Sequence, residues 1–315
     1  MVQGMNNSRS MSMDKDSSIM KAVTWFVKRI RVRMWRLLTK FRPSITVKTK
    51  QGVFKVLTGT EESIGRSLYC NGEFELDLIV NTTAFLRSIG KCPAKGMGTL
   101  VDVGANNGVI SIGMLQTGQM ERAIAIEPEP RNFAVLEHNV SLNGLKDRFI
   151  CLPCAVSDVS KKIDFELSSS NFGDHRVRAD TTSRDASNAK HGESGRSVIS
   201  VQSERLDNLL VNQPPAFVDN IALIWIDVQG YDGFVFKGAK NYLKQDLPVM
   251  TEIWPYGIGR SGMTREEYCE IAASIWRSYW VWRNEKFVRY PIQMLDVFFD
   301  ELGADGKYGN VLFAQ

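Results

Sequence analysis

A short turn near residue 104 combines an acid, two glycines and an asparagine. Asp102 belongs to the apolar run 99–103, and Gly104, Asn106 and Gly108 follow it. Glycine allows a tight turn and a close approach of the backbone to a ligand, and asparagine tolerates left-handed geometry. The order differs from the GxGxxG pyrophosphate cradle, and an acid directly before the glycines suits a ligand with an ammonium group. We therefore interpret this turn as a site for the amino-acid end of a ligand.

A second acid, Glu127, follows the next apolar run, 122–126, and comes 23 residues after Gly104. In nucleotide-binding sheets, a carboxylate about 20 residues beyond the glycine turn accepts hydrogen bonds from ribose hydroxyls. S-adenosylmethionine carries both a ribose and an ammonium group. Either acid alone is explained equally well as a helix cap, but the ordered pair on successive strands predicts S-adenosylmethionine as the cofactor.

Two further side chains are candidates for accepting a proton from a substrate. Asp227 ends the strand expected over 221–228 and is the preferred catalytic base. His175 is the alternative because an imidazole titrates near neutral pH, although an ordinary surface histidine explains it as well. Asp227 and Glu252 could together bracket a divalent cation that orients a hydroxyl. No third ligand is evident in the sequence, so we do not favour a divalent cation and name no metal ligands.

These side chains need a scaffold that brings strand ends together, and the pattern from about residue 98 predicts one. Apolar runs alternate with amphipathic segments, which is typical of an α/β fold with a doubly wound, mostly parallel sheet. Ligands of such sheets bind at the carboxyl ends of the strands. The expected strands are 99–103, 122–126, 149–156, 221–228, 249–253, 279–283 and 309–314, and the expected helices begin near 107, 130, 234 and 265.

The first 50 residues differ in charge from the rest of the chain. They hold 12 Lys and Arg against two acids, whereas the remaining residues hold 27 basic and 33 acidic side chains. An acidic body argues against a nucleic-acid-binding core. Residues 21–41 have the spacing of a basic amphipathic helix, which can lie on an anionic membrane surface or dock on its own domain or a partner. We expect 1–45 to hold a disordered start and this helix, 46–98 a hairpin and helix extension, and 99–315 the catalytic domain.

Composition bears on the cellular setting as well. The longest uncharged apolar run, 221–226, is far shorter than the ~20 residues that span a bilayer. Five scattered cysteines do not form a disulfide framework and favour a reducing compartment. We therefore expect a cytoplasmic protein, with peripheral membrane contact through the basic helix left open. Residues 178–197 have almost no apolar content and are expected to form a long mobile loop.

Several segments, taken in order, resemble the FkbM-type S-adenosylmethionine-dependent methyltransferases. The segments that carry the resemblance are 102–108, 127–130, Asn139, 155–158, 226–232 and Glu252. The resemblance implies a class I, Rossmann-like methyltransferase domain that methylates a hydroxyl of a small molecule or glycan. Gln229 stands where this family usually has glutamate.

The resemblance also implies roles for individual residues. The proton acceptor would be Asp227 or His175, as above. The implied donor contacts are Asp102, Gly104, Asn106 and Gly108 for the methionine end of S-adenosylmethionine, Glu127 for its ribose, and Ser157 and Asp158 near its adenine.

Two other classes of protein stay open at this point. One is a non-catalytic domain of the same fold that acts as an interaction module through its basic helix. The other is a nicotinamide-dependent oxidoreductase on a similar sheet, which the missing GxGxxG and the acid in the first turn disfavour.

Overall fold

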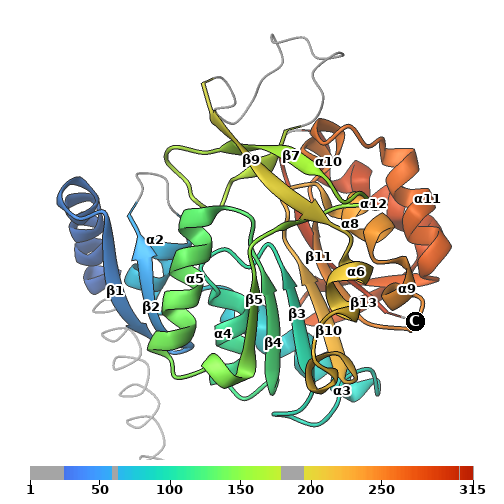
Figure 1. Cartoon of the computed structure of the whole chain (residues 1–315), viewed down its shortest axis with the longest axis horizontal. Helices are drawn as coiled ribbons and strands as arrows, with labels where there is room; N and C mark the ends of the chain where they lie inside the picture. The colour runs from blue at the N-terminus through green and yellow to red at the C-terminus, as the bar shows by residue number, and fades with distance from the viewer. Residues whose placement is uncertain (1–24, 59–62, 179–194, 305, 315) are drawn as a thin grey trace, which may run out of the picture.

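Eight strands form one central sheet in the computed structural model, which describes residues 25–58, 63–178, 195–304 and 306–314. In chain order they are β3 (Thr99–Val103), β4 (Arg122–Ile126), β5 (Phe149–Leu152), β10 (Ile221–Ile226), β11 (Val249–Ile253), β12 (Ser278–Arg283), β13 (Lys286–Pro291) and β14 (Gly309–Phe313). Their order across the sheet is β13-β12-β14-β11-β10-β3-β4-β5, and Figure 1 shows β5, β4, β3 and β10 side by side. Strands β5, β4, β3, β10 and β11 are parallel, and β14, β12 and β13 pair antiparallel. The doubly wound, mostly parallel sheet predicted from the sequence is confirmed.

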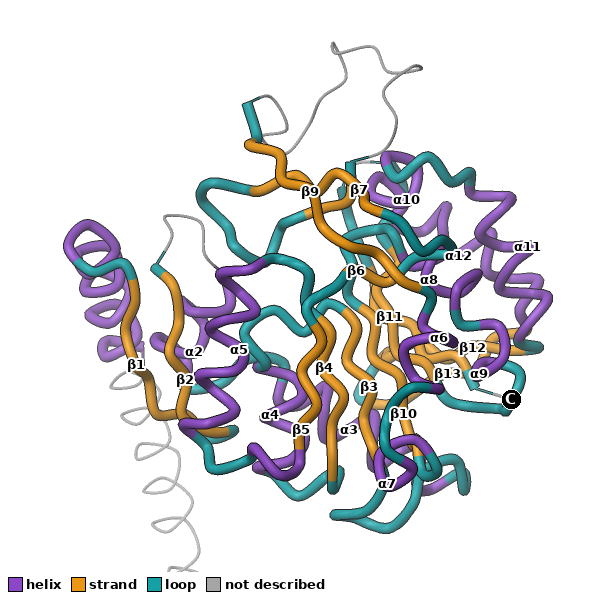
Figure 2. Tube along the Cα trace, in the orientation of Figure 1, coloured by secondary structure: helices purple, strands orange, loops and turns teal. Residues whose placement is uncertain are grey.

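Helices cover both faces of this sheet (Figure 2). In β3, Leu100 belongs to one hydrophobic cluster and Val101 and Val103 to another, because successive side chains of a strand point to opposite faces. The Leu100 face is covered by α2 (Ser63–Asn71), α3 (Leu76–Ser88), α4 (Val109–Gln116) and α5 (Pro130–Leu142). The opposite face is covered by α6 (Leu206–Val211), α8 (Asp232–Gly238), α9 (Lys240–Leu243), α10 (Pro255–Arg260), α11 (Arg265–Ile275) and α12 (Leu295–Leu302). Short connections contain α7 (Pro215–Val218), η1 (Lys146–Arg148) and η3 (Ile292–Met294).

A second, four-stranded sheet lies beyond the carboxyl ends of the central strands (Figure 1). It contains β6 (Ala155–Val156), β7 (Lys162–Leu167), β8 (Arg176–Val177) and β9 (Ser197–Glu204), in the order β6-β9-β7-β8. The prediction of a single strand over 149–156 is therefore wrong. Its first half stays in the central sheet and its second half joins the small one, with Pro153, which has no N–H to donate to a ladder, at the break.

The N-terminal part packs on the face of the sheet that carries α4 and α5. Strands β1 (Ser44–Thr49) and β2 (Gly52–Leu57) form the expected hairpin. The buried side chain of Gln51 fastens the turn, since its Nε2 donates to the carbonyls of Phe74 and Val109 and its Oε1 accepts from the Phe74 N–H. Before the hairpin, residues 25–41 are helical.

Some expectations fall on residues that lie outside the described ones. These are the disordered start expected within 1–45, the first four residues of the helix expected over 21–41 and most of the loop expected over 178–197. Among the described residues, no helix is both long enough and apolar enough to cross a bilayer.

Candidate active site

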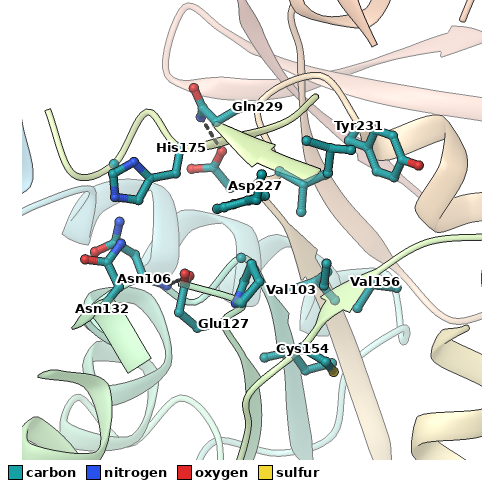
Figure 3. A pocket seen from close by; sticks show the side chains of 18 of the residues that line it. Val103, Asn106, Glu127, Asn132, Cys154, Val156, His175, Asp227, Gln229 and Tyr231 are labelled. Atoms are coloured by element: carbon teal, nitrogen blue, oxygen red, sulfur yellow. Dashed lines mark hydrogen bonds between the residues drawn. The ribbon is translucent and has the colours of Figure 1, made fainter. Parts of the chain in front are cut away.

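A cleft opens where β3, β4 and β10 end and the small sheet begins (Figure 3). It encloses, with its mouth, about 640 Å³ of atom-free space. Five of the site residues predicted from the sequence line it: Gly104, Asn106, Glu127, His175 and Asp227. They come from segments that are far apart in the chain, and the parallel strand ends bring them together, as the fold type predicts.

The turn after β3 is shaped to bring its backbone close to β10. A Cβ atom on Gly104 would lie 2.0 Å from the carbonyl oxygen of Asp227, and the φ of Gly104 is +86°. Only glycine fits this position, because a side chain would clash with backbone and the conformation is left-handed. Asn106 also adopts a left-handed φ, +51°, and its Nδ2 donates to the Phe172 carbonyl at 3.0 Å. The turn is thus closed on one side by β10 and on the other by the segment that precedes β8.

Glu127 is held in the cleft by backbone groups. Its Oε2 accepts from the Asn106 N–H at 2.9 Å and its Oε1 from the Glu129 N–H at 2.8 Å. The residue is 5% exposed, and burial raises the pKa of its carboxyl to about 8. In its ionised form the carboxyl has about four lone-pair sites, so two remain for a ligand. Ionised Glu127 is therefore a fixed acceptor for two hydroxyl groups.

Four of the predicted donor contacts do not line the cleft: Asp102, Gly108, Ser157 and Asp158. Asp102 lies on the same face of β3 as Leu100, so its carboxylate meets Ser111 of α4, and burial raises its pKa to about 7. Ser157 is fully buried, but its Oγ lies 3.1 Å from the hydroxyl of Tyr231, which does line the cleft. Its Oγ also donates to Asp158. Ser157 therefore contacts a residue that lines the cleft, Tyr231, and Asp158 contacts Ser157.

Asp227 lies at the opposite side of the cleft, directly after β10. Its Oδ1 accepts from Nε2 of Gln229 at 2.7 Å, and Gln229 adopts a left-handed φ of +55° that turns its side chain back toward the acid (Figure 3). Asp227 is exposed to solvent in the cleft. The protein atoms around its carboxyl displace part of the water that would hydrate the charge, and this desolvation raises its pKa. Gln229, the departure from the family pattern, therefore positions Asp227.

Two other carboxylates crowd Asp227. Burial, together with repulsion from Asp227, raises the pKa of Glu252 to about 9 and that of Glu75 to about 7. Glu75 precedes α3 with a left-handed φ of +51°. Sequence reasoning missed Glu75, because no local pattern connects it with β10. Within the described residues, no group of three or more His, Cys, Asp and Glu side chains is arranged to hold a metal ion.

His175 lines the cleft as a neutral hydrogen-bond donor. Its Nδ1 accepts from the Ser168 N–H at 3.0 Å, so in the neutral ring the hydrogen is on Nε2. Burial lowers its pKa to about 4, and the residue is 7% exposed. Among the described residues, Nε2 has no hydrogen-bond partner. Because neither ring nitrogen has a free lone pair, His175 is unsuited to the role of base and suited to that of a donor.

Comparison with known proteins was made on sequence and on structure. The family model of the methyltransferase FkbM domain matches residues 102–276. The 2-O-methyltransferase NoeI of Sinorhizobium fredii is 30% identical over 159 residues, which are 49% of this chain and 62% of that protein. This chain therefore spans less than two thirds of that relative.

Two solved structures are similar to this chain at lower sequence identity. Methyltransferase FkbM from Methylobacillus flagellatus has a TM-score of 0.39 at 15% identity, over 70% of this chain and 44% of that one. The tRNA m1G37 methyltransferase of M. jannaschii has a TM-score of 0.40 at 9% identity, over 87% of this chain and 56% of that one.

The family match covers 175 of the 315 residues and contains Asp102, Glu127, His175 and Asp227. The chain belongs to the FkbM methyltransferase family.

Proposed function

We propose that this protein is an S-adenosylmethionine-dependent O-methyltransferase that methylates a hydroxyl of a small molecule or glycan. The observation that carries the proposal is that two carboxylates of different character, Glu127 and Asp227, face one cleft from the ends of β4 and β10. Family membership supports methyl transfer. The name of the relative that is 30% identical, a 2-O-methyltransferase, favours oxygen as the methyl acceptor.

The residues of the cleft fit S-adenosylmethionine. Glu127 has two lone-pair sites left for ribose hydroxyls, and the left-handed turn at Gly104 brings backbone rather than side chain to the ligand. His175 has a buried N–H without a partner among the described residues, which is costly unless a ligand supplies an acceptor. Apolar and aromatic side chains, Ile126, Val156 and Tyr231 among them, line the remainder and suit a nucleobase.

Within the proposed reaction, this chain has to position the acceptor and remove its proton. When bound, S-adenosylmethionine supplies a methyl group already activated by a positive sulfur, which keeps the electrons of the broken bond. Asp227 would accept a hydrogen bond from the acceptor hydroxyl and take its proton as the oxygen gains the methyl group. Burial, with repulsion from Asp174 adding to it, raises the pKa of Asp227 and makes it a stronger base than an ordinary aspartate. Gln229 holds one Asp227 oxygen, which leaves the other to the substrate.

Methyl-labelled S-adenosylmethionine tests the proposal. The full chain is incubated with the labelled donor and a panel of glycosides, aliphatic alcohols and phenols, and the Asp227→Asn variant is the control. We expect transfer to a hydroxyl, giving an ether that resists mild alkali, unlike a methyl ester. Donor binding without transfer to any acceptor of the panel would favour the non-catalytic module, and transfer to nitrogen alone would contradict the O-methyl assignment.

A further inference from the structure

The helix of residues 25–41 is attached to the body by one face. Trp35 is 2% exposed and belongs to the same buried cluster as Phe54 and Leu68. Its ring lies against α2. A Cβ atom on Gly65 would lie 3.0 Å from the Trp35 ring, and the centroids of the Trp35 and Tyr69 rings are 5.8 Å apart. The Trp35 contacts therefore fix the helix on the rest of the protein, and they determine which way its other faces point.

A second face of this helix exposes an apolar stripe. At 100° per residue, six large side chains fall within an arc of about 100° that points away from Trp35. Each of them is between 41% and 75% exposed. An exposed apolar patch on this scale is typical of an interaction site. The apolar stripe consists of Phe26, Val27, Ile30, Met34, Leu37 and Phe41.

A row of basic side chains runs along one edge of the apolar stripe. On the same helical projection it occupies an arc of about 60°. All four of its members are exposed, and residues 25–42 contain no acid. The basic row consists of Arg29, Arg33, Arg36 and Lys40.

We infer that the apolar stripe and the basic row together form a docking surface for an anionic lipid bilayer. The stripe would enter the boundary between headgroups and acyl chains, and the row would meet lipid phosphates. Two copies that paired antiparallel through the stripe would place their basic rows on the same side, where like charges repel, whereas an anionic membrane complements both the stripe and the row. The rest of the chain, with 27 basic and 33 acidic residues beyond residue 50, does not supply this attraction. The helix lies at the edge of the molecule beside β1 (Figure 1), where a flat surface can reach it. The inference goes beyond methyl transfer and holds whether or not the cleft is catalytic.

Vesicle co-sedimentation of the full chain tests this inference. Vesicles of phosphatidylcholine alone are compared with equimolar phosphatidylcholine and phosphatidylglycerol, at low and at high salt. We expect binding to the anionic vesicles to be at least about tenfold stronger than to the neutral ones, and to weaken with added salt because exposed charges are screened. Equal binding to both kinds of vesicle, or none to either, would overturn the inference.

Three variants assign any binding to the helix. Arg33→Gln, Arg36→Gln and Lys40→Gln together should weaken anionic binding at least about tenfold, and Ile30→Ser with Leu37→Ser should abolish it at high salt. All five side chains are exposed, so both variants should keep the wild-type melting temperature. The control replaces three exposed lysines by Gln: Lys240 of α9, Lys244 directly after it and Lys286 of β13. Figure 1 shows α9 and β13 on the side of the molecule away from the helix.

The outcomes separate the alternatives. Unchanged binding by the control with loss in both helix variants supports the inference. A loss by the control as large as that of the basic-row variant would mean nonspecific charge attraction and overturn it. So would a dimer, seen by analytical ultracentrifugation, that Ile30→Ser with Leu37→Ser dissociates while vesicles go unbound, since the stripe would then face a second copy.

Discussion

The two sides of the cleft hold their acids in different ways. At the end of β4, the Glu127 carboxylate is fixed by two backbone N–H groups, 2.9 and 2.8 Å away. At the end of β10, Asp227 has a single side-chain donor, Gln229, and two acidic neighbours, Glu75 and Glu252. A carboxylate fixed by backbone recognises hydroxyls in one geometry. Burial raises the pKa of both carboxyls, so the contrast lies in the groups that hold them. Two backbone donors leave Glu127 less free to turn than one side-chain donor leaves Asp227. From this contrast we propose recognition for the first side and proton transfer for the second.

Asp227→Asn should have the largest effect of the substitutions, because it removes the proposed base on the β10 side of the cleft. The amide cannot take a proton, so turnover is expected to fall by about 10²-fold or more, while donor affinity stays near wild type. The rate is measured with the labelled donor and the acceptor found in the panel. Asp147→Asn, at an exposed acid outside the cleft, serves as the matched control and should keep the wild-type rate. A wild-type rate in Asp227→Asn would remove it from the reaction.

Glu127→Ala should weaken donor binding on the β4 side of the cleft. It removes the proposed ribose acceptor and leaves two backbone N–H groups without their partner, so donor affinity is expected to fall at least about tenfold, or about 1.4 kcal/mol. Calorimetry with S-adenosylhomocysteine measures this, with the exposed Glu137→Ala as control. A thermal melt shows whether the loop has also loosened. Unchanged affinity in a folded variant would sink the ribose assignment.

Two substitutions at His175 sharpen the comparison by separating donor from base. Asparagine places an acceptor near the position of Nδ1 and removes the Nε2 donor, whereas glutamine carries a donor to the position of Nε2. We expect Asn to reduce turnover about fivefold, as for one lost hydrogen bond, and Gln to recover part of it. Neither should move the inflection of the pH–rate profile. A loss as large as that of Asp227→Asn, with the inflection gone, would make His175 the base.

The smallest expected effect is on stability against pH. Burial raises the pKa of Glu127 from 4.5 to about 8 and that of Asp102 from 3.8 to about 7. The folded state therefore binds protons that the unfolded chain has lost, and the stability contributed below the unfolded values is lost as pH rises through the folded ones. We expect the melting temperature of ligand-free protein to fall by a few degrees between about pH 5 and about pH 8. Glu127→Ala should make the fall of melting temperature with pH less steep. An equally steep fall in that variant would show that the Glu127 carboxyl does not cause it.

The sequence predicts the first side of the cleft better than the second. Gly104, Asn106 and Glu127 follow two consecutive strands, so local spacing is enough to place them in one cleft. Strand alternation would also have shown that Asp102 faces α4 with Leu100, on the side away from the cleft.

The second side depends on contacts between distant segments. Glu75 reaches the neighbourhood of β10 only because α3 packs on the sheet, and the tautomer of His175 depends on the Ser168 N–H. The move of residues 155–156 into the small sheet likewise depends on pairing with β9. No spacing or periodicity within the sequence encodes these arrangements.

Calorimetric titration of the full chain with S-adenosylmethionine, and then with S-adenosylhomocysteine, tests the central claim most directly, because it needs no acceptor. The two-sided cleft predicts that both bind with micromolar affinity, one molecule per chain, and that Glu127→Ala weakens both while Asp227→Asn weakens neither. If protein that is folded by circular dichroism binds neither ligand, the cleft is not a methyl-donor site and the proposed function is wrong.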